Sequence, residues 1–347
     1  SILKPSSLLS KRLSMKRKNT SAHQLDKSLL NIYSNFKSFL DKNLKSKKFV
    51  IGVSGGPDSL ALAYFAKIYS SEKKIDFTCI IIDHGVRKAS EQEAKQVKKV
   101  LFKKKIKSAI FKIKISNGKN FHLEARQKRY KKISEFCKKK KIKYILLGHH
   151  LDDQIENFYI RLSRGSGLTG LSPIKKILKY EKYILLRPFL NLRKNQLIKI
   201  SKKYFNFYIK DLSNLKNKYL RSRVRKLRAF MEKEGFGDLR LLKTLDNFDK
   251  AGEALNFYSK TAQKKFFKKQ KNFTSISKKL FSEPNEIIFR CMSNFFTKIK
   301  DYPPRAKGIN RLIADLSQSN KKKVTLGGYI FENGLNLVKV KREIRNY

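Results

Sequence analysis

The feature that most constrains the fold is a regular alternation of short apolar runs and longer segments between residues 49 and 162. The apolar runs have the length of buried strands, and the segments between them repeat apolar residues at helical spacing. We predict strands at residues 49–53, 77–83, 109–115 and 144–148, and helices at residues 57–69, from 90 onward, at 120–140 and at 151–162. Because strands that alternate with helices form a parallel sheet covered on both faces, we expect an α/β fold with ligands at the carboxyl ends of the strands.

The second half of the chain has a different pattern. Beyond about residue 217 the alternation stops, and helical spacing of apolar residues takes over. We predict helices at residues 219–233, 239–269 and 285–297, and a closing β-hairpin of residues 324–331 and 335–340 that turns near Asn333 and Gly334.

These patterns divide the chain into three predicted parts. Residues 1–21 form a basic tail, residues 22–215 an α/β domain, and residues 216–347 a smaller, mainly helical domain that ends in the hairpin. Three interpretations of the first part stay open: a tail, an organellar transit peptide, or an extension upstream of a start at Met15.

The chain carries a large excess of positive charge. Its 347 residues include 82 Lys and Arg against 27 Asp and Glu, a formal net charge of +55. One interpretation is a lysine-rich proteome, in which lysines only solvate helix faces. The other is a polyanionic partner, since a basic surface releases the counterions condensed on nucleic acid. So large an excess, on a chain with enough hydrophobic residues to fold, favours a nucleic-acid partner.

Several classes of protein are disfavoured by what the sequence lacks. The three cysteines, Cys79, Cys137 and Cys291, stand far apart, so a zinc ribbon, an iron–sulfur cluster or a disulfide framework is not expected. No apolar run reaches the roughly 18 residues of a membrane span. We therefore predict a cytoplasmic protein with no membrane partner. The sequence leaves the oligomeric state open, and a homodimer is compatible with it.

The first predicted helix is preceded by a glycine-rich turn, Ser54-Gly55-Gly56-Pro57-Asp58-Ser59. Glycines let the backbone approach an anion, so that successive N–H groups and the helix N-terminus can cradle phosphate. The turn lacks the spacing of a Walker loop and that of a dinucleotide fold. An ordinary strand-to-helix turn is the alternative interpretation.

Two further motifs lie near other predicted strand ends. Asp83, in the run Asp83-His84-Gly85-Val86-Arg87, is placed to meet Mg²⁺, a nucleotide or an amine, or simply to cap its turn. Arg126 and Arg129 are three residues apart on one helix face, where two guanidiniums suit phosphate, although paired surface arginines are the simpler interpretation.

The richest motif follows the strand at 144–148. It reads Gly148-His149-His150-Leu151-Asp152-Asp153-Gln154-Ile155-Glu156-Asn157. Asp153 and Glu156 are about one helical turn apart and can hold Mg²⁺ or a cationic substrate, although acids at a helix start also suit the helix dipole. A basic segment near the domain boundary, with Arg221, Arg223 and Arg225, suits the phosphate backbone of RNA, or else forms a solvated helix.

Taken in order, these strings resemble the tRNA(Ile)-lysidine synthetase (or synthase) family of PP-loop ATP pyrophosphatases. The resemblance covers roughly residues 48–228 and rests on the strings SGGPDS, DHGVR, ARQKRY, GHHLDDQIEN, RGSGLTGL, RPFL, DLSN and RSRVR. Two positions depart from the family pattern: Asn157 stands where Thr is usual, and Ser222 where Asn is usual. Both departures concern substrate contacts rather than the reaction.

The resemblance implies a Rossmann-like PP-loop domain and a ligase reaction. ATP would adenylate the wobble cytidine of the isoleucine tRNA with anticodon CAU, and free L-lysine would displace AMP to form lysidine. It implies that Ser54, Gly55, Gly56, Pro57, Asp58 and Ser59 hold ATP, that Asp83, Asp153 and Glu156 hold lysine and Mg²⁺, with Asp153 as the tentative metal ligand, and that Arg129 stabilises phosphate charge. It further implies that Arg126, His150, Arg221, Arg223 and Arg225 contact substrate. A tRNA-thiolating PP-loop enzyme and a non-catalytic RNA-binding protein are the alternatives.

Overall fold

The computed structural model describes residues 25–85, 88–115, 121–209, 220–297, 304–318 and 321–343. The predicted tail at 1–21 and the string DLSN at 211–214 lie outside these residues. Two compact units are present: Ser1–Gly165 with Pro173–Asp238, and Ser166–Ser172 with Leu239–Tyr347. Whereas we predicted a boundary near residue 215, the division falls after Asp238, because the helix that precedes it packs on the first unit.

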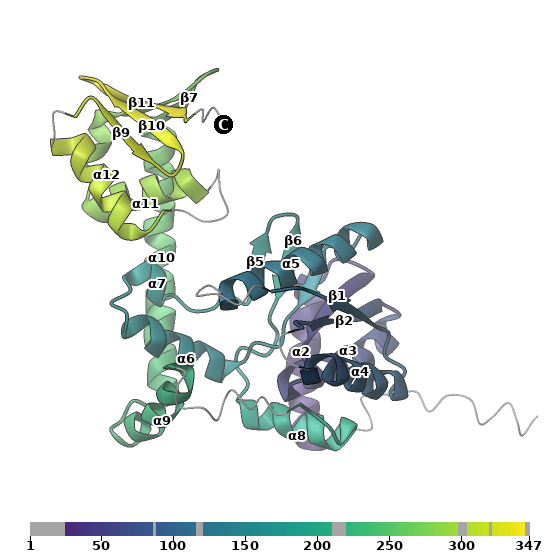
Figure 1. The fold of residues 1–347 in the computed structure, drawn as a ribbon. Helices are drawn as coiled ribbons and strands as arrows, with labels where there is room; N and C mark the ends of the chain where they lie inside the picture. Colours follow the sequence, from purple (N-terminus) through teal and green to yellow (C-terminus); the bar gives the residue numbers. More distant parts are fainter. Residues whose placement is uncertain are drawn as a thin grey trace, which may run out of the picture. The chain divides into compact units, whose positions relative to one another are not determined.

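A six-stranded sheet forms the centre of the first unit, in the order β3-β2-β1-β4-β6-β5 (Figure 1). Its strands are β1 (Lys48–Val53), β2 (Asp76–Asp83), β3 (Ser108–Lys112), β4 (Tyr144–Leu146), β5 (Ile177–Tyr180) and β6 (Tyr183–Leu186). All neighbours pair in parallel except β5, which is antiparallel to β6. The predicted α/β fold is confirmed, with an added antiparallel edge that sequence patterning did not reveal.

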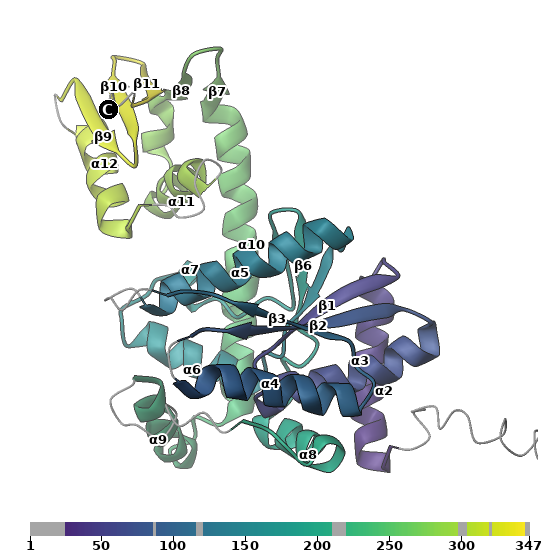
Figure 2. The ribbon, with the colours of Figure 1, turned by 45° about the vertical axis from the view of Figure 1, so that its right-hand side comes forward.

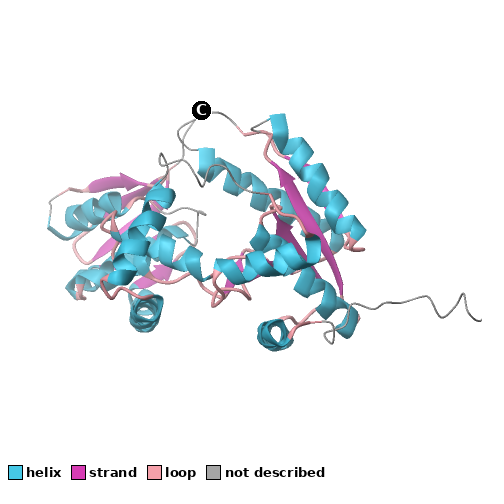
Figure 3. Ribbon diagram, turned by 90° about the horizontal axis from the view of Figure 1, so that it is seen from below, coloured by secondary structure: helices cyan, strands magenta, loops and turns pink. Residues whose placement is uncertain are grey.

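Helices cover both faces of this sheet (Figures 2 and 3). They are α2 (Lys27–Asn43), α3 (Pro57–Lys73), α4 (Lys88–Lys103), α5 (Phe121–Lys140) and α8 (Lys194–Phe205). Two further helices of this unit, α6 (Leu151–Leu162) and α9 (Leu220–Lys233), pack against each other. Successive strand residues face opposite ways. Ile51 and Cys79 therefore join a core with α2, α3, α4 and α8, whereas Val50 and Ile80 pack against α5. The parallel strands end at one edge, where the predicted motifs gather.

The second unit is built on a five-stranded antiparallel sheet in the order β7-β8-β11-β10-β9. Its elements are α7 (Leu168–Leu171), α10 (Asp238–Phe266), β7 (Phe267–Lys269), β8 (Thr274–Ser277), the 3-10 helix η3 (Lys278–Ser282), α11 (Asn285–Thr297), α12 (Ala306–Gln318), β9 (Lys323–Leu326), β10 (Tyr329–Asn333) and β11 (Leu337–Arg342). Side chains such as Val338 and Val340 face a core with α11 and α12, while Lys339 and Lys341 between them are exposed.

The predicted closing hairpin is therefore one part of a larger sheet. The run expected as a single strand, residues 324–331, is two strands, because Gly327 and Gly328 turn the chain with φ of 62° and 79°. Such angles are open to glycine at little steric cost. The turn at Asn333 and Gly334 lies between β10 and β11 as predicted.

Candidate active site

The turn between β1 and α3 is closed by its own two serines. The Ser59 hydroxyl donates to the Gly56 carbonyl oxygen at 3.0 Å and accepts from the Ser54 backbone N–H at 3.2 Å. Pro57 takes the first position of α3, after Gly56 in an extended conformation. The helix N-terminus thus opens at the carboxyl end of β1, an arrangement that binds phosphate. The predicted ATP-binding residues lie together here, and their role stays a prediction.

A short strap after α8 lies against this turn. The Ile209 backbone N–H donates to the Gly55 carbonyl oxygen at 2.9 Å. Gly55 has a φ of 83°, and a Cβ there would lie 2.5 Å from Cγ2 of Val97 and 2.7 Å from Cδ1 of Ile209. Both the backbone angle and the available space therefore require glycine at position 55. No sequence pattern pointed to Ile209, because its partner is far away along the chain.

His150 connects the turn with the acidic helix α6. Its side chain is 2% exposed and caps α6: Nδ1 accepts from the Asp153 N–H, while the Asp153 carboxylate accepts from the His150 N–H. Nε2 lies 3.5 Å from Oδ2 of Asp58. Burial opposes the imidazolium, but Asp58 and Asp153 more than offset it, so the pKa of His150 is raised. These contacts fit a residue that positions acids, and the substrate contact predicted for His150 stays a prediction.

Glu156 and Asp153 are paired with arginines of α9. Glu156 is 2% exposed, and its Oε2 accepts from Nε of Arg221 at 2.8 Å and from Arg225 at 3.2 Å. Arg221 also donates to Oδ1 of Asp153 at 3.1 Å. Burial opposes the charge of Arg225, but Glu156 more than offsets it and raises the pKa of Arg225. A carboxylate this buried requires a cation, since an unpaired charge would lose its hydration without compensation.

Arginines of the basic segment predicted to contact tRNA thus also pair with the acids of α6. Arg221 is 51% exposed and Arg225 30% exposed, so each pairs with α6 while part of its side chain reaches solvent. Arg223 is exposed on the same helix. The predicted RNA contact stays a prediction for all three arginines.

A second ion-pair network lies next to the first and was not predicted. Arg228 donates to Asp152 and, at 2.7 and 2.8 Å, to both carboxylate oxygens of Asp238, which is 5% exposed. Asp238 also pairs with Arg193 at 2.9 Å. Asp152 accepts from the Lys194 backbone N–H at 2.7 Å. This network holds the N-termini of α6 and α8 together with α9, and so fixes the acids beside it.

Asp83 ends β2 and is 4% exposed. Its Oδ1 accepts from the Gly85 N–H at 2.9 Å and from the Ser90 hydroxyl. His84 follows, with Nε2 3.1 Å from the Arg129 guanidinium and a buried Nδ1 for which the described residues offer no hydrogen-bond partner. Burial and the charge of Arg129 lower the pKa of His84 to about 4. Asp83 thus forms the capping contacts of the simpler interpretation, and a contact with lysine or Mg²⁺ stays a prediction.

Two arginines, Arg126 and Arg187, act on His149, which follows β4. Of these residues, only Arg126 was a predicted site residue. Arg126 stacks over the Tyr130 ring at 5.1 Å. Arg187, which follows β6 and is 4% exposed, donates from Nε to Nδ1 of His149 at 3.3 Å. Burial, with the charges of Arg187 and Arg126, lowers the pKa of His149 to about 4, against the attraction of Asp153. His149 is therefore neutral near pH 7 and accepts from a charged arginine.

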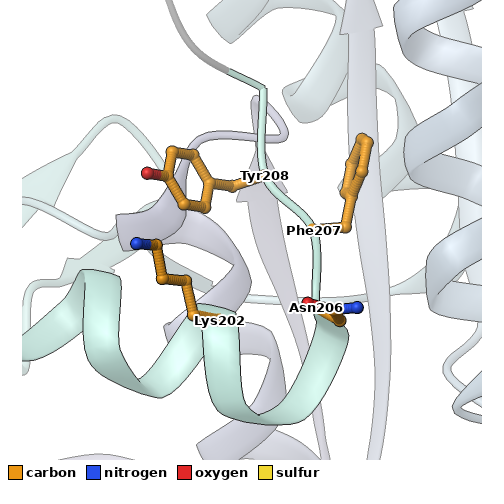
Figure 4. A pocket seen from close by; sticks show the side chains of 4 residues that line it. All are labelled: Lys202, Asn206, Phe207 and Tyr208. Carbon is orange, nitrogen blue, oxygen red and sulfur yellow. The ribbon is translucent and has the colours of Figure 1, made fainter.

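A cavity of about 460 Å³ opens at the end of α8. Lys202, Asn206, Phe207 and Tyr208 line it, and Figure 4 shows Lys202 and Tyr208 on one side of the segment with Phe207 on the other. Residues 207 and 208 lead directly into Ile209, so the cavity borders the strap on the glycine-rich turn. It contains none of the predicted site residues.

Within the described ranges, no three His, Cys, Asp or Glu side chains converge as a metal site. Mg²⁺ often binds through only one or two carboxylates together with nucleotide phosphates. Asp153, 18% exposed, fits that kind of ligation, and its role as a metal ligand stays a prediction.

Comparison with known proteins places these features in a family. A model of the PP-loop domain matches residues 24–230. A curated tRNA(Ile)-lysidine synthase of a Wolbachia species (Brugia malayi, strain TRS) is 30% identical over 304 residues, which cover 82% of this chain and 68% of that protein. The chain belongs to the PP-loop tRNA(Ile)-lysidine synthases. It is also 37% identical over 184 residues to the synthase of Orientia tsutsugamushi (strain Boryong), covering 53% of this chain and 42% of that protein.

Family membership does not extend to every part of the relatives. The chain spans about half the length of the curated synthases that it matches first. Among solved structures, the U34-tRNA thiolase NcsA of Methanococcus maripaludis has a TM-score of 0.54 at 19% identity, covering 65% of this chain and 78% of that one. This likeness concerns the fold alone. Among the described residues, no helix is both long and apolar enough to cross a membrane.

Proposed function

We propose that this lysidine synthase family member ligates L-lysine to the wobble cytidine of the isoleucine tRNA with anticodon CAU. ATP is consumed, pyrophosphate and AMP are released, and the cytidine is adenylated in between. Support comes from the glycine-rich turn at the end of β1 and the carboxylates at the end of β4, because neighbouring strands bring the two motifs to one edge of the sheet.

The observation that carries the proposal is the buried carboxylate of Glu156. This side chain is 2% exposed, and the guanidiniums of Arg221 and Arg225 pair with it. The site on α6 therefore already binds cationic groups. A free lysine brings ammonium groups of the same charge, and Asp153 stands one helical turn away to bind a second donor. A neutral or acidic amino acid could not replace those partners without leaving a buried charge unpaired.

The chemistry has two steps. In the first, the oxygen on carbon two of cytosine attacks the α-phosphorus of ATP, and the bond to the β-phosphate oxygen breaks to release pyrophosphate. In the second, the lysine ε-amine attacks carbon two, and AMP leaves with its oxygen. The chain's own contribution is to orient three reactants and to balance phosphate charge, which suffices for much of such catalysis.

Different charged and polar groups at the edge of the sheet would bind the triphosphate and stabilise its charge. The α3 N-terminus, with Ser54 and Ser59, would hold the triphosphate, and Arg129 would stabilise charge as the adenylate forms and breaks. Mg²⁺, bound by Asp153 and phosphate oxygens, would neutralise part of the triphosphate charge. Burial of His150 between Asp58 and Asp153 would keep the two acids at a constant separation.

RNA binding is supported by the charge of the chain and by the second unit. The net charge is +55, and the exposed Lys339 and Lys341 alternate with core residues along β11. We propose this unit as a tRNA-binding domain, with the exposed arginines of α9 as further contacts. Phosphate contacts of this kind position an RNA without reading its sequence.

Labelled-lysine incorporation tests the proposal. The purified chain, incubated with ATP and Mg²⁺, should attach lysine to a CAU-anticodon isoleucine tRNA and not to the methionine tRNA with the same anticodon. The variant Asp153→Asn should retain tRNA affinity and lose incorporation. Hydrolysis of ATP with no label on the isoleucine tRNA would overturn the lysidine proposal.

Thiolation is the second candidate, raised by the fold likeness to NcsA. The cysteines argue against it. Cys79, Cys137 and Cys291 are buried, and burial raises the pKa of Cys137 to about 12 and that of Cys79 still further. Thiols held protonated in a core are poor nucleophiles and poor metal ligands.

A further inference from the structure

Arg187 is a buried cation with no anionic partner among the described residues. Its side chain is 4% exposed, Nε donates to His149 at 3.3 Å, and an Nη atom donates to the Lys175 carbonyl oxygen at 2.7 Å. Both acceptors are uncharged. Within the described residues, no carboxylate forms an ion pair with Arg187, whereas Glu156 takes two arginines on the other side of His150.

A buried charge of this kind is costly to maintain. Burial lowers the pKa of Arg187, the nearby Tyr130 opposes this effect, and the positive charge of Arg126 adds to it. Hydrogen bonds to neutral groups compensate only part of the lost hydration. The guanidinium remains protonated, so an anion that enters the site would be attracted by a positive charge that no carboxylate of the described residues neutralises.

Two more arginines extend the positive charge along the same edge. Arg126 and Arg129 lie in the first half of α5, the helix that follows the carboxyl end of β3. Arg129 contacts His84 after β2, and Arg126 acts electrostatically on His149 after β4 and on Arg187 after β6. Among the described acids, none pairs with either arginine within ion-pair distance. The three guanidiniums thus span the strand ends on the α5 face, with the glycine-rich turn of β1 between them.

We propose that Arg187, together with Arg126, binds a phosphate group beside the glycine-rich turn. His149 orients Arg187 for this contact by accepting from Nε, and Lys175 accepts from Nη1, so the ligand would bind the Nη2 side of the guanidinium. The inference rests on the proposed function for the source of the phosphate. That source is either the pyrophosphate end of ATP or a phosphodiester next to the target cytidine, since both offer the same oxygens to an arginine fork.

The test is equilibrium binding to the full chain, without lysine and without turnover. Inorganic pyrophosphate and a short single-stranded RNA with the anticodon-loop sequence are titrated separately, at about 150 mM salt to suppress unspecific attraction. The variants are Arg187→Gln, Arg187→Lys and Arg126→Gln. Lys45→Gln, an exposed lysine before the amino end of β1, is the matched control for the loss of one positive charge.

We expect Arg187→Gln and Arg126→Gln to weaken one of the two ligands by about tenfold or more, with Arg187→Lys between them and the wild type. Weaker pyrophosphate binding assigns the site to ATP, and weaker RNA binding assigns it to the phosphodiester; either result supports the anion site. Unchanged affinity for both ligands in folded variants overturns it. If thermal unfolding shows that Arg187→Gln does not fold, Arg126→Gln decides by the same criterion. Since neither titration needs lysine transfer, the anion site and the lysidine proposal can fail independently.

Discussion

Nε of Arg221 donates to Oε2 of Glu156 at 2.8 Å and thereby joins α9 to the acidic helix α6, across 65 residues of sequence. The acid that we propose for substrate lysine is therefore occupied by the chain's own arginine. A lysine that binds Glu156 has to displace Arg221 or Arg225, and an RNA that draws these arginines to its phosphates would release the acid. The two proposed ligands are coupled through one ion pair.

Removal of Arg221 should strengthen lysine binding in the absence of tRNA. Because Arg221 is half exposed, its pairing is worth little, and Arg221→Ala should raise lysine affinity only about two- to fivefold. Titration calorimetry with L-lysine and ATP measures this. Lys226→Ala, an exposed neighbour on α9, is the control. Unchanged lysine affinity with weakened tRNA binding would mean that Arg221 serves RNA alone.

Glu156→Gln should cost both stability and activity. The variant leaves Arg221 and Arg225 beside a neutral amide, and we expect the free energy of unfolding to fall by about 1–3 kcal/mol, less than for a wholly buried pair because both arginines reach solvent. Lysine incorporation should be lost. Denaturant titration and the labelled-lysine assay measure the two effects, with the exposed Glu232→Gln as control. An unaltered unfolding midpoint would contradict the structural part.

The two glycines of the turn should respond differently to alanine. Gly55→Ala places a methyl group against Val97 and Ile209 at a φ of 83°, so we expect a loss of about 1–3 kcal/mol in stability. A Cβ at Gly56 would lie 3.5 Å from Oγ of Ser54, an ordinary contact, so this variant should fold normally but bind ATP more weakly where phosphate approaches. Thermal unfolding and ATP titration of both variants check this, and equal Tm values would refute the steric argument for Gly55.

Stability should decrease in mild acid because of two histidines. The pKa values of His84 and His149 are lowered to about 4, whereas an unfolded chain titrates near the ordinary value of 6.5. Between these values the unfolded state binds more protons, so the free energy of unfolding falls as pH decreases from about 6.5 to 4, by less than ~1.4 kcal/mol per pH unit for each group. Denaturant unfolding at several pH values measures this effect. In the double variant His84→Gln, His149→Gln, the free energy of unfolding should depend less on pH than in the wild type. Identical slopes would contradict the assigned shifts.

Local patterns in the sequence were sufficient for most elements of the first unit. The helix at 151–162 and the helix at 285–297 have the predicted bounds, and strands β1, β2 and β4, which end at Val53, Asp83 and Leu146, lie where apolar runs indicated. Strands β5 to β8 were missed, because three or four residues give no period to detect, and the pairing that stabilises them is nonlocal. The motifs of the candidate site could thus be recognised in the sequence. The chemistry of each motif could be interpreted, but the contacts between motifs could not.

The partners of those residues depended on the packed chain. Periodicity acts over one or two helical turns, so the sequence alone determined the strand–helix alternation, the glycine-rich turn and the acids that follow β4. It could not indicate that Arg228 reaches Asp152 across 76 residues, that Ile209 covers Gly55, or that no acid in the described part of the chain pairs with Arg187. Such contacts form where separate elements meet in three dimensions, and burial there decides which charges require a partner.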